Sequence, residues 1–378
     1  MPRTALTNAR EIVVKIGSQL LATARRPRGG GEPRLAVDTR FIGAIARQVA
    51  GLHADGRRVT LVSSGAIAAG CAELGRADRP TDVADAQAVA AVGQRRLMTH
   101  WHDAFARVGL GVGQVLLTRT DFDDRLRFLN LHNCVTRLQA MDCVPIANEN
   151  DTVAVEELRF GDNDLLAALL SNAVHADALV ILSGVAGLLD GGGAVIPEVS
   201  DLLAASAQVR ADRSGWGSGG MGTKIDAARI VVGAGATCVI AGGRQRDVVA
   251  RVLAGEAEDA GTLFVPAARR LDARRRWIGL TARPAGGVTV DAGAARALAG
   301  GGASLLASGI TATTGAFDRG DVLLVRDAAG RELARGLSNY AAAEVRLLQG
   351  RQSGDFARIL GRPAYSAVIH RDSLVLTG

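Results

Sequence analysis

The sequence predicts an α/β protein whose larger part is a doubly wound, mostly parallel sheet, followed by a smaller, mostly β C-terminal domain. Three observations support this class. Short apolar runs alternate with stretches of helical periodicity as far as residue 253. Polar and glycine-rich clusters stand where the expected strands end, which is the ligand-binding edge of such a sheet. Beyond residue 287, short apolar runs are split by Gly and Asp turns, as in a small β domain.

Strands are expected where β-branched and other aliphatic residues run together, and helices where apolar residues recur every three or four positions. The expected strands are residues 11–18, 58–62, 112–117, 144–147, 178–182 and 237–241. The expected helices are residues 37–53, 67–72, 85–105, 128–141, 165–170, 225–235 and 246–253. In the C-terminal part, short strands are expected at residues 288–291, 304–307, 309–310, 321–326 and 333–338.

Composition narrows the class of protein. The 378 residues suffice for two domains, and a hydrophobic share of 48% with only 3% aromatic residues predicts aliphatic cores. The net charge of +6 favours anionic ligands, but arginine-rich composition alone makes it weak evidence for nucleic acid. Four scattered cysteines without a CxxC pair indicate reduced thiols in a cytoplasmic protein. The N-terminus has no signal-peptide pattern, and polar residues interrupt the most apolar stretch, 165–189, so no membrane span is expected.

The lysines are the most informative residues, because the chain has only two, Lys15 and Lys224, against many arginines. Lys224 ends a glycine-dense loop, 214–224, that leads into the expected helix 225–235, and such a loop can cradle an anion. Lys15 lies within a strand expected to be buried, so it should stand near the strand end and meet an anion. A flexible surface loop is the alternative for a glycine run. The lysine usage instead predicts that both ammonium groups meet across one phosphate chain.

Polar residues gather at three further strand or helix ends. Ser63–Ala66 follow the strand 58–62 and form either a second anion cradle or an ordinary helix cap. Asn148–Asp151 follow the strand 144–147, and residues 160–164 precede a helix with Asp164 in its first turn. A single carboxylate there could be only a cap. Two such clusters within twenty residues exceed what capping needs and indicate a binding site.

Together these segments resemble the amino acid kinase family. The motifs that carry the resemblance are residues 14–18, 63–70, 148–151, 161–164 and 218–224, and it covers nearly the whole chain. The C-terminal part resembles a PUA domain, which accompanies the glutamate-phosphorylating members. The resemblance implies an amino acid kinase domain over residues 1–268, an arginine-rich connector over 269–278 and a PUA-like domain over 279–378.

The resemblance also implies an activity: ATP-dependent phosphorylation of the side-chain carboxylate of L-glutamate to L-glutamyl 5-phosphate, the first step of proline biosynthesis. It implies feedback inhibition by proline, a homo-oligomer, and a downstream glutamyl phosphate reductase. The residue types agree with this chemistry. Phosphoryl transfer needs positioning and charge stabilisation, and no general base is required because the glutamate carboxylate is already ionised.

The resemblance further implies that the catalytic residues are Lys15, Asp164 and Lys224, with Asp164 between the two ammonium groups. Ser64, Gly65, Asp151 and Asn163 would bind glutamate, Asp151 through its α-ammonium group. The expected nucleotide contacts are Lys15, Ser183, Gly184, Ser218, Gly219, Gly220, Met221, Gly222, Thr223 and Lys224. Mg²⁺ would arrive bound to ATP, since no dedicated ligand set is evident. The family usually has Thr-Asp at Ser183-Gly184, which places the nucleotide contact there in doubt.

Two alternatives remain at this stage. An RNA-binding protein could use the β domain and the stretch Arg269–Arg276, but arginine clusters are more often solvated connectors, so RNA is not an expected partner. A related enzyme could act on aspartate or N-acetylglutamate. Asp151 favours a substrate with a free α-amino group and so disfavours the acetylated acid.

Overall fold

The computed structural model describes residues 4–25, 34–154, 163–200, 220–255, 260–266 and 272–377. The chain forms two compact units, Met1–Arg270 and Leu271–Gly378.

The first unit is built on an eight-stranded sheet among the described residues, in the order β5-β6-β4-β1-β7-β9-β10-β8. Its strands are β1 (Glu11–Ile16), β4 (Arg58–Ser63), β5 (Gly111–Leu117), β6 (Cys143–Glu149), β7 (Ala178–Ser183), β8 (Glu198–Val199), β9 (Thr237–Gly242) and β10 (Thr262–Phe264). The pairs that involve β1, β4, β5, β6, β7 and β9 with one another are parallel, whereas β10 runs antiparallel to β9. The predicted doubly wound, mostly parallel sheet is confirmed.

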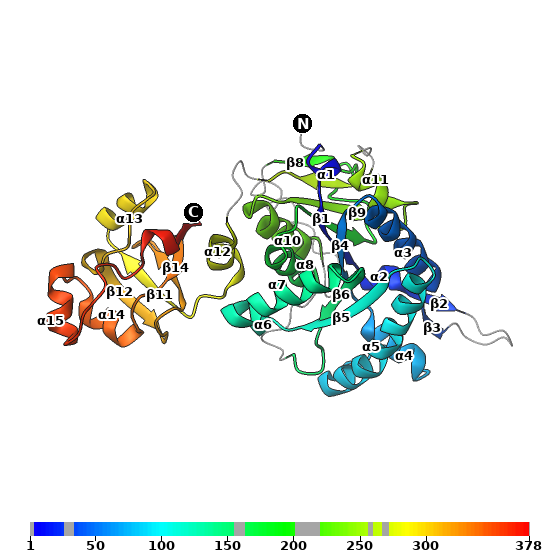
Figure 1. Ribbon diagram of the computed structural model, residues 1–378, viewed down its shortest axis with the longest axis horizontal. Helices are drawn as coiled ribbons and strands as arrows, with labels where there is room; N and C mark the ends of the chain where they lie inside the picture. Colours follow the sequence, from blue (N-terminus) through cyan, green and yellow to red (C-terminus); the bar gives the residue numbers. More distant parts are fainter. Residues whose placement is uncertain are drawn as a thin grey trace. The chain divides into compact units, whose positions relative to one another are not determined.

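Helices cover both faces of this sheet (Figure 1). One layer contains α3 (Thr39–Ala54), α4 (Ala66–Glu73), α5 (Val83–Ala106) and α11 (Val248–Leu253), and the other contains α7 (Arg125–Gln139), α8 (Asn163–Ala173) and α10 (Met221–Gly233). Shorter elements complete the unit: α1 (Thr4–Thr7), α2 (Ser18–Leu21), α6 (Thr120–Asp123) and the hairpin β2 (Ala22–Arg25) and β3 (Arg34–Val37).

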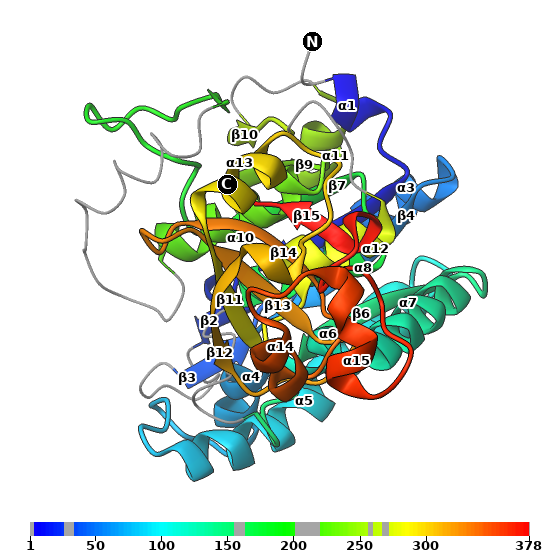
Figure 2. The same cartoon turned by 90° about the vertical axis from the view of Figure 1, so that its left-hand side faces the viewer.

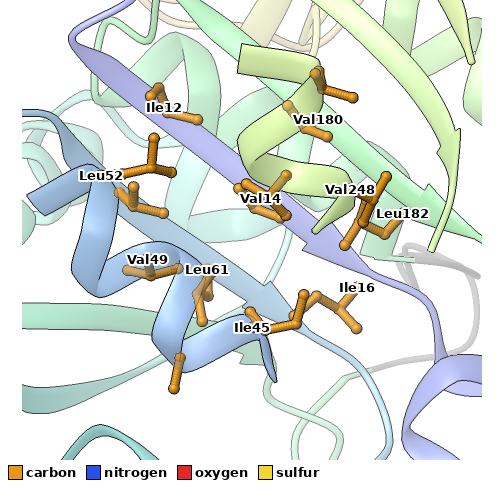
Figure 3. Close-up of a cluster of buried hydrophobic side chains, with 14 of the residues drawn as sticks. Ile12, Val14, Ile16, Ile45, Val49, Leu52, Leu61, Val180, Leu182 and Val248 are labelled. Carbon is orange, nitrogen blue, oxygen red and sulfur yellow. The ribbon is translucent and has the colours of Figure 1, made fainter. Parts of the chain in front are cut away.

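The central strand β1 shows how the sequence assigns side chains to the two faces. Ile12, Val14 and Ile16 point toward α3 and α11 and pack in a cluster of buried apolar side chains (Figure 3). Because side chains alternate along a strand, Lys15 must face the other way, toward the layer of α8 and α10. The alternation therefore places the buried ammonium group opposite the main apolar cluster, next to the two helices that begin at the polar motifs.

The second unit has a five-stranded sheet in the order β12-β11-β13-β14-β15 (Figure 2). The strands are β11 (Gly286–Val290), β12 (Ile310–Gly315), β13 (Val322–Arg326), β14 (Glu332–Leu337) and β15 (Leu374–Leu376), with helices α13 (Ala292–Ala299), α14 (Ala342–Leu348) and α15 (Phe356–Leu360). The expected small β domain is confirmed. The strand expected at 304–307 is wrong: only Leu305 forms an isolated bridge, with Ile369, and a 3₁₀ turn follows at Ala307–Gly309. Before the sheet, α12 (Ala273–Arg276) runs into a π-helix at Trp277–Thr281.

Candidate active site

Two lysines and one aspartate meet in the interior of the first unit. Lys15 Nζ lies 2.6 Å from Asp164 Oδ1, and Lys224 Nζ lies 3.0 Å from Asp164 Oδ2. Lys15 comes from β1, Asp164 from the first turn of α8 and Lys224 from the first turn of α10. All three side chains are buried, with relative exposures of 1%, 0% and 5%. The structure thus brings together the three residues that the sequence proposed as catalytic, with the carboxylate between the ammonium groups.

Three charged side chains are held together in this cluster. Ammonium and carboxylate groups are stable in an interior only when they are paired and hydrogen-bonded. Both ammonium groups lie against the same carboxylate, that of Asp164. The hydroxyl of Thr223 also lies 3.0 Å from Asp164 Oδ2. Two ammonium groups restrained in this way are suited to hold an anion, and above all one whose charge increases during a reaction.

The N-terminus of α10 adds backbone donors to the same region. Its N-cap residue, Gly220, offers no side chain to the first-turn N–H groups, and the 13-residue helix begins at Met221. Unpaired N–H groups and the helix dipole both favour an anion at such an end. Gly220, Met221, Gly222, Thr223 and Lys224 therefore stand together, whereas Ser218 and Gly219 lie outside the described residues.

Ser183 and Gly184 lie at the end of β7, beside β1 in the sheet. Gly184 has a close neighbour: a Cβ added there would lie 2.5 Å from Gln19 Oε1. The amide of Gln19 thus occupies the space into which a larger residue at position 184 would project. An aspartate at position 184 would therefore require Gln19 to move, whereas glycine does not.

A cavity of about 290 Å³ opens in the same unit, between the motifs at residues 18–22, 64–68 and 148–151. The four residues predicted to bind substrate all line it: Ser64, Gly65, Asp151 and Asn163. The other polar lining residues are Ser18, Gln19, Arg79, Asn148 and Glu149. The cavity is small and carries both acidic and basic groups, which suits a small zwitterionic ligand.

Gly65 shapes one wall of this cavity. It adopts a left-handed conformation with φ of 102° and stands at the N-cap of α4, where no side chain caps the helix. Only glycine adopts this φ without strain. Helix α4 is fixed by very close packing on α5, because Cβ atoms added at Gly70 and Gly93 would fall 1.9 Å and 1.8 Å from backbone oxygens of the facing helix. The sequence therefore holds the free N–H groups of the α4 N-terminus at a defined place on the cavity wall.

Side-chain amides connect the cavity wall to the layer behind it. Asn163 Nδ2 donates to Asn148 Oδ1 at 2.8 Å and to Ser64 Oγ at 3.0 Å. Asn148 Nδ2 in turn donates to Gln94 Oε1 at 2.8 Å. Sequence reasoning gave no role to Asn148 or Gln94. Asn148 stood in a recognised motif and could have been included, whereas a glutamine in the long helix α5 carries no signal before the fold is known.

The cysteines near the site are not suited to nucleophilic catalysis. Burial raises the pKa of the Cys71 thiol, which lines the cavity. Burial also raises the pKa of the fully buried Cys238, and the negative charge of Asp164 adds a smaller effect in the same direction. Both thiols therefore stay protonated at neutral pH, and a covalent mechanism through sulfur is disfavoured.

The described residues contain no group of three or more His, Cys, Asp and Glu side chains placed to hold a metal ion. No helix in the described parts of the chain combines the length and the apolar character needed to cross a bilayer.

Comparison with known proteins shows which family the chain is similar to. The sequence matches the amino acid kinase family over residues 10–242 and the PUA domain over residues 286–360. It is 45% identical to the glutamate 5-kinase of Paracidovorax citrulli, with 100% of both chains covered. It is 44% identical to that of Geobacter sp. (strain M21), again with 100% of both covered. For the glutamate 5-kinase of a Synechococcus strain the identity is 43%, over 97% of this chain and 98% of the relative.

A solved structure supports the fold. N-acetylglutamate synthase from Neisseria gonorrhoeae superposes with a TM-score of 0.51 over 70% of this chain and 62% of that chain. The two sequences are 15% identical, so this likeness concerns the fold alone. The resemblance inferred from the motifs is confirmed by the full-length relatives and by the matched residues: the chain belongs to the amino acid kinase family and carries a PUA domain.

Proposed function

We propose that the protein acts as a glutamate 5-kinase, transferring the γ-phosphoryl group of ATP to the side-chain carboxylate of L-glutamate. The observation that carries this proposal is the buried Lys15–Asp164–Lys224 cluster, which lies in the same unit as the small cavity lined by acidic and basic groups. The full-length relatives named glutamate 5-kinase support the choice of reaction. The product is L-glutamyl 5-phosphate, and the reaction is the first step of proline biosynthesis.

In this mechanism one oxygen of the glutamate side-chain carboxylate attacks the γ-phosphorus. A new oxygen–phosphorus bond forms while the bond from phosphorus to the bridging oxygen breaks, and ADP is displaced with that electron pair. No proton moves, because the attacking carboxylate is ionised at neutral pH. The ammonium groups of Lys15 and Lys224 stabilise the charge on the transferring group, and Asp164 holds both in place.

The cavity residues divide the recognition of glutamate between them. Asp151 is the proposed partner of the α-ammonium group, because it is an acidic residue on the cavity wall. The uncapped N-terminus of α4 beside Gly65 is the proposed site of the α-carboxylate, since its free N–H groups favour a negative charge. Ser64 and Asn163, joined by a hydrogen bond, complete the wall.

The nucleotide phosphates are assigned to the N-terminus of α10 and the two lysines, and the rest of the nucleotide to the region of Ser183 and Gly184. This donor set consists of ammonium and N–H groups, which fit phosphate oxygens and not a cation. Mg²⁺ bound to the phosphates of ATP would supply further charge neutralisation there. Asp164 already serves the lysines, so we assign no metal ligand to the chain.

The decisive experiment traps the acyl phosphate with hydroxylamine as a hydroxamate. The purified protein with ATP and Mg²⁺ should form hydroxamate with L-glutamate. It should form none with L-aspartate or with N-acetyl-L-glutamate. L-Aspartate is one methylene shorter, and the N-acetyl group removes the positive charge that Asp151 would bind. Hydroxamate formed from either analogue in preference to glutamate, or from none of the three, would refute the proposed substrate.

Four further properties belong to the same proposal. Proline, a cyclic relative of glutamate, should compete for the cavity, and a rate unchanged at saturating proline would exclude this inhibition. The protein should form a homo-oligomer and be located in the cytoplasm. A glutamyl phosphate reductase should consume the product, because an acyl phosphate hydrolyses readily when it is released.

A further inference from the structure

A relay of side-chain amides runs from helix α5 to the cavity wall. It starts at Gln94, whose Oε1 accepts a hydrogen bond from Asn148 Nδ2 at 2.8 Å. It continues from Asn148 Oδ1, which accepts from Asn163 Nδ2 at 2.8 Å. Asn148 is 3% exposed and Asn163 is 7% exposed, so both amides are buried. Asn148 and Asn163 line the cavity, whereas Gln94 lies behind them.

Backbone groups fix the direction of this relay. Asn148 Oδ1 also accepts from the backbone N–H of Glu149 at 2.9 Å, and an N–H can only donate. Asn163 Nδ2 lies 3.3 Å from the backbone oxygen of Ser63, which can only accept. If either amide were reversed, groups of the same kind would face each other. The nitrogen of Asn148 must therefore point to Gln94, which is the acceptor that keeps this amide in place.

The relay decides what Asn163 offers to a ligand. Its nitrogen is turned toward Ser63, Ser64 and Asn148, so its remaining polar atom is Oδ1. This oxygen is buried and has no hydrogen-bond partner among the described residues. A buried acceptor without a donor is unfavourable until a donor reaches it. The cavity thus presents an acceptor at Asn163, on the same wall as the carboxylate of Asp151, and the ammonium group of an amino acid carries N–H donors that can reach this acceptor.

We infer that Gln94 is a positioning residue that makes the cavity selective for acids with a free α-ammonium group. It acts by holding Asn148, which holds the Asn163 amide with its oxygen available to the ammonium group. This inference rests on the proposed glutamate kinase activity and deepens it. The discrimination is against dicarboxylic acids that lack the amino group, which offer no N–H to Asn163 Oδ1.

The test compares L-glutamate with glutarate, the same dicarboxylate without the α-amino group, in the hydroxamate assay. Gln94→Met keeps the size of the side chain and removes the acceptor. It should lower the preference for glutamate over glutarate, as the ratio of kcat/KM values, by about tenfold or more, which corresponds to about 1.4 kcal/mol. The KM for ATP should stay within about twofold, because the relay does not reach the lysines. Gln94→Glu keeps an acceptor oxygen and should retain most of the preference.

The matched control is Gln48→Met, which removes another amide acceptor. Gln48 Oε1 accepts from the backbone N–H of Val249 at 2.9 Å, on α11 and away from the cavity. This variant should keep the substrate preference even if it is less stable. If Gln94→Met does not fold, Gln94→Asn withdraws the same oxygen by one methylene group and should show the same loss.

The outcomes separate the two proposals. A wild-type protein that does not phosphorylate glutamate refutes the proposed function. A wild-type protein that does so, with an unchanged preference in Gln94→Met or Gln94→Asn, refutes only the role of Gln94. An equal loss in Gln94→Glu and Gln94→Met also refutes it, because the acceptor would then not be the feature that matters.

Discussion

The carboxylate of Asp164 is the part of the site whose removal has the most calculable effect. Asp164 is fully buried and lies 2.6 Å and 3.0 Å from the two ammonium groups. Asp164→Asn keeps the shape of the side chain and removes its charge, leaving both ammonium groups without a counter-charge from this position. Removal of one partner from a buried pair costs about 3–5 kcal/mol. Since the substitution removes one carboxylate that contacts both lysines, we apply this range once.

Thermal unfolding measures this cost. At about 2–4 °C per kcal/mol for a unit of this size, the transition of the first unit should fall by at least about 6 °C. A non-hydrolysable ATP analogue supplies negative charge to the same lysines, so it should raise the Tm of the variant by more than it raises that of the wild type. In the kinase assay, kcat should fall by at least about 10²-fold, because the lysines lose the group that orients them.

A second aspartate provides the control. Asp38 pairs with Arg244 at 2.7 Å, with side chains 19% and 52% exposed, and it caps α3 by accepting from Phe41 N–H. Asparagine also caps helices well, and exposed ion pairs contribute at most about 1 kcal/mol. Asp38→Asn should therefore change the Tm by a few degrees at most. The reasoning is refuted if Asp164→Asn unfolds within about 1 °C of the wild type, or if its kcat is unchanged.

Three other predictions follow. Lys15→Arg keeps the charge and replaces a compact ammonium by a planar fork in a fully buried position, so kcat should fall by at least about 10-fold while the protein stays folded by circular dichroism; near-normal kcat would contradict the assigned role. Gly93→Ala places a methyl group 1.8 Å from the backbone oxygen of Ala66, so the free energy of unfolding in denaturant should fall by about 1–3 kcal/mol and the KM for glutamate should rise. The control is Gly51→Ala, whose methyl group meets nothing within 4 Å, and it should change neither quantity. Burial raises the pKa of Glu11, so the protonated carboxyl group favours the folded state; this contribution is present below the unfolded pKa of about 4.5 and is lost as pH rises through the raised value. The free energy of unfolding of the wild type, relative to that of Glu11→Gln, should therefore increase as pH falls from 7 to 4.5. A difference that does not change with pH would exclude this linkage.

Much of the α/β unit follows from local sequence. The aliphatic runs at β1, β4, β7 and β9 are buried along almost their whole length, as expected for parallel strands covered on both faces. The element boundaries were predicted less well: β1 ends at Ile16, before the expected end at residue 18, and α10 begins at Met221, before the expected start at residue 225, so Lys224 belongs to the helix and not to the loop. The two lysines could be selected as a pair because the rest of the chain expresses positive charge as arginine.

The strand expected at 304–307 shows where local pattern fails. The run Ser304–Ala307 is as apolar as its neighbours, and Leu305 and Ala307 are indeed buried. Burial of a short apolar run does not require a ladder of hydrogen bonds, and this run forms a bridge and a turn instead. Short apolar runs are ambiguous for this reason, and only the arrangement of the neighbouring strands decides between the two outcomes.

Local patterns in the sequence predicted the main strands and helices and the ends at which polar residues stand, because alternation and helical periodicity are local properties. The reaction was expected from the family resemblance of those motifs. The position of Asp164 between Lys15 and Lys224 was expected only from the family resemblance, and the tertiary structure supplies its distances to them. The contacts by which Gln94 holds Asn148, and through it Asn163, were not expected and come from the tertiary structure. Contacts of this kind join residues tens to more than a hundred positions apart, and their existence depends on the order of strands in the sheet and on how closely the helices pack. A hydrogen bond that requires atoms within about 3 Å is set by that packing, and no local pattern specifies it.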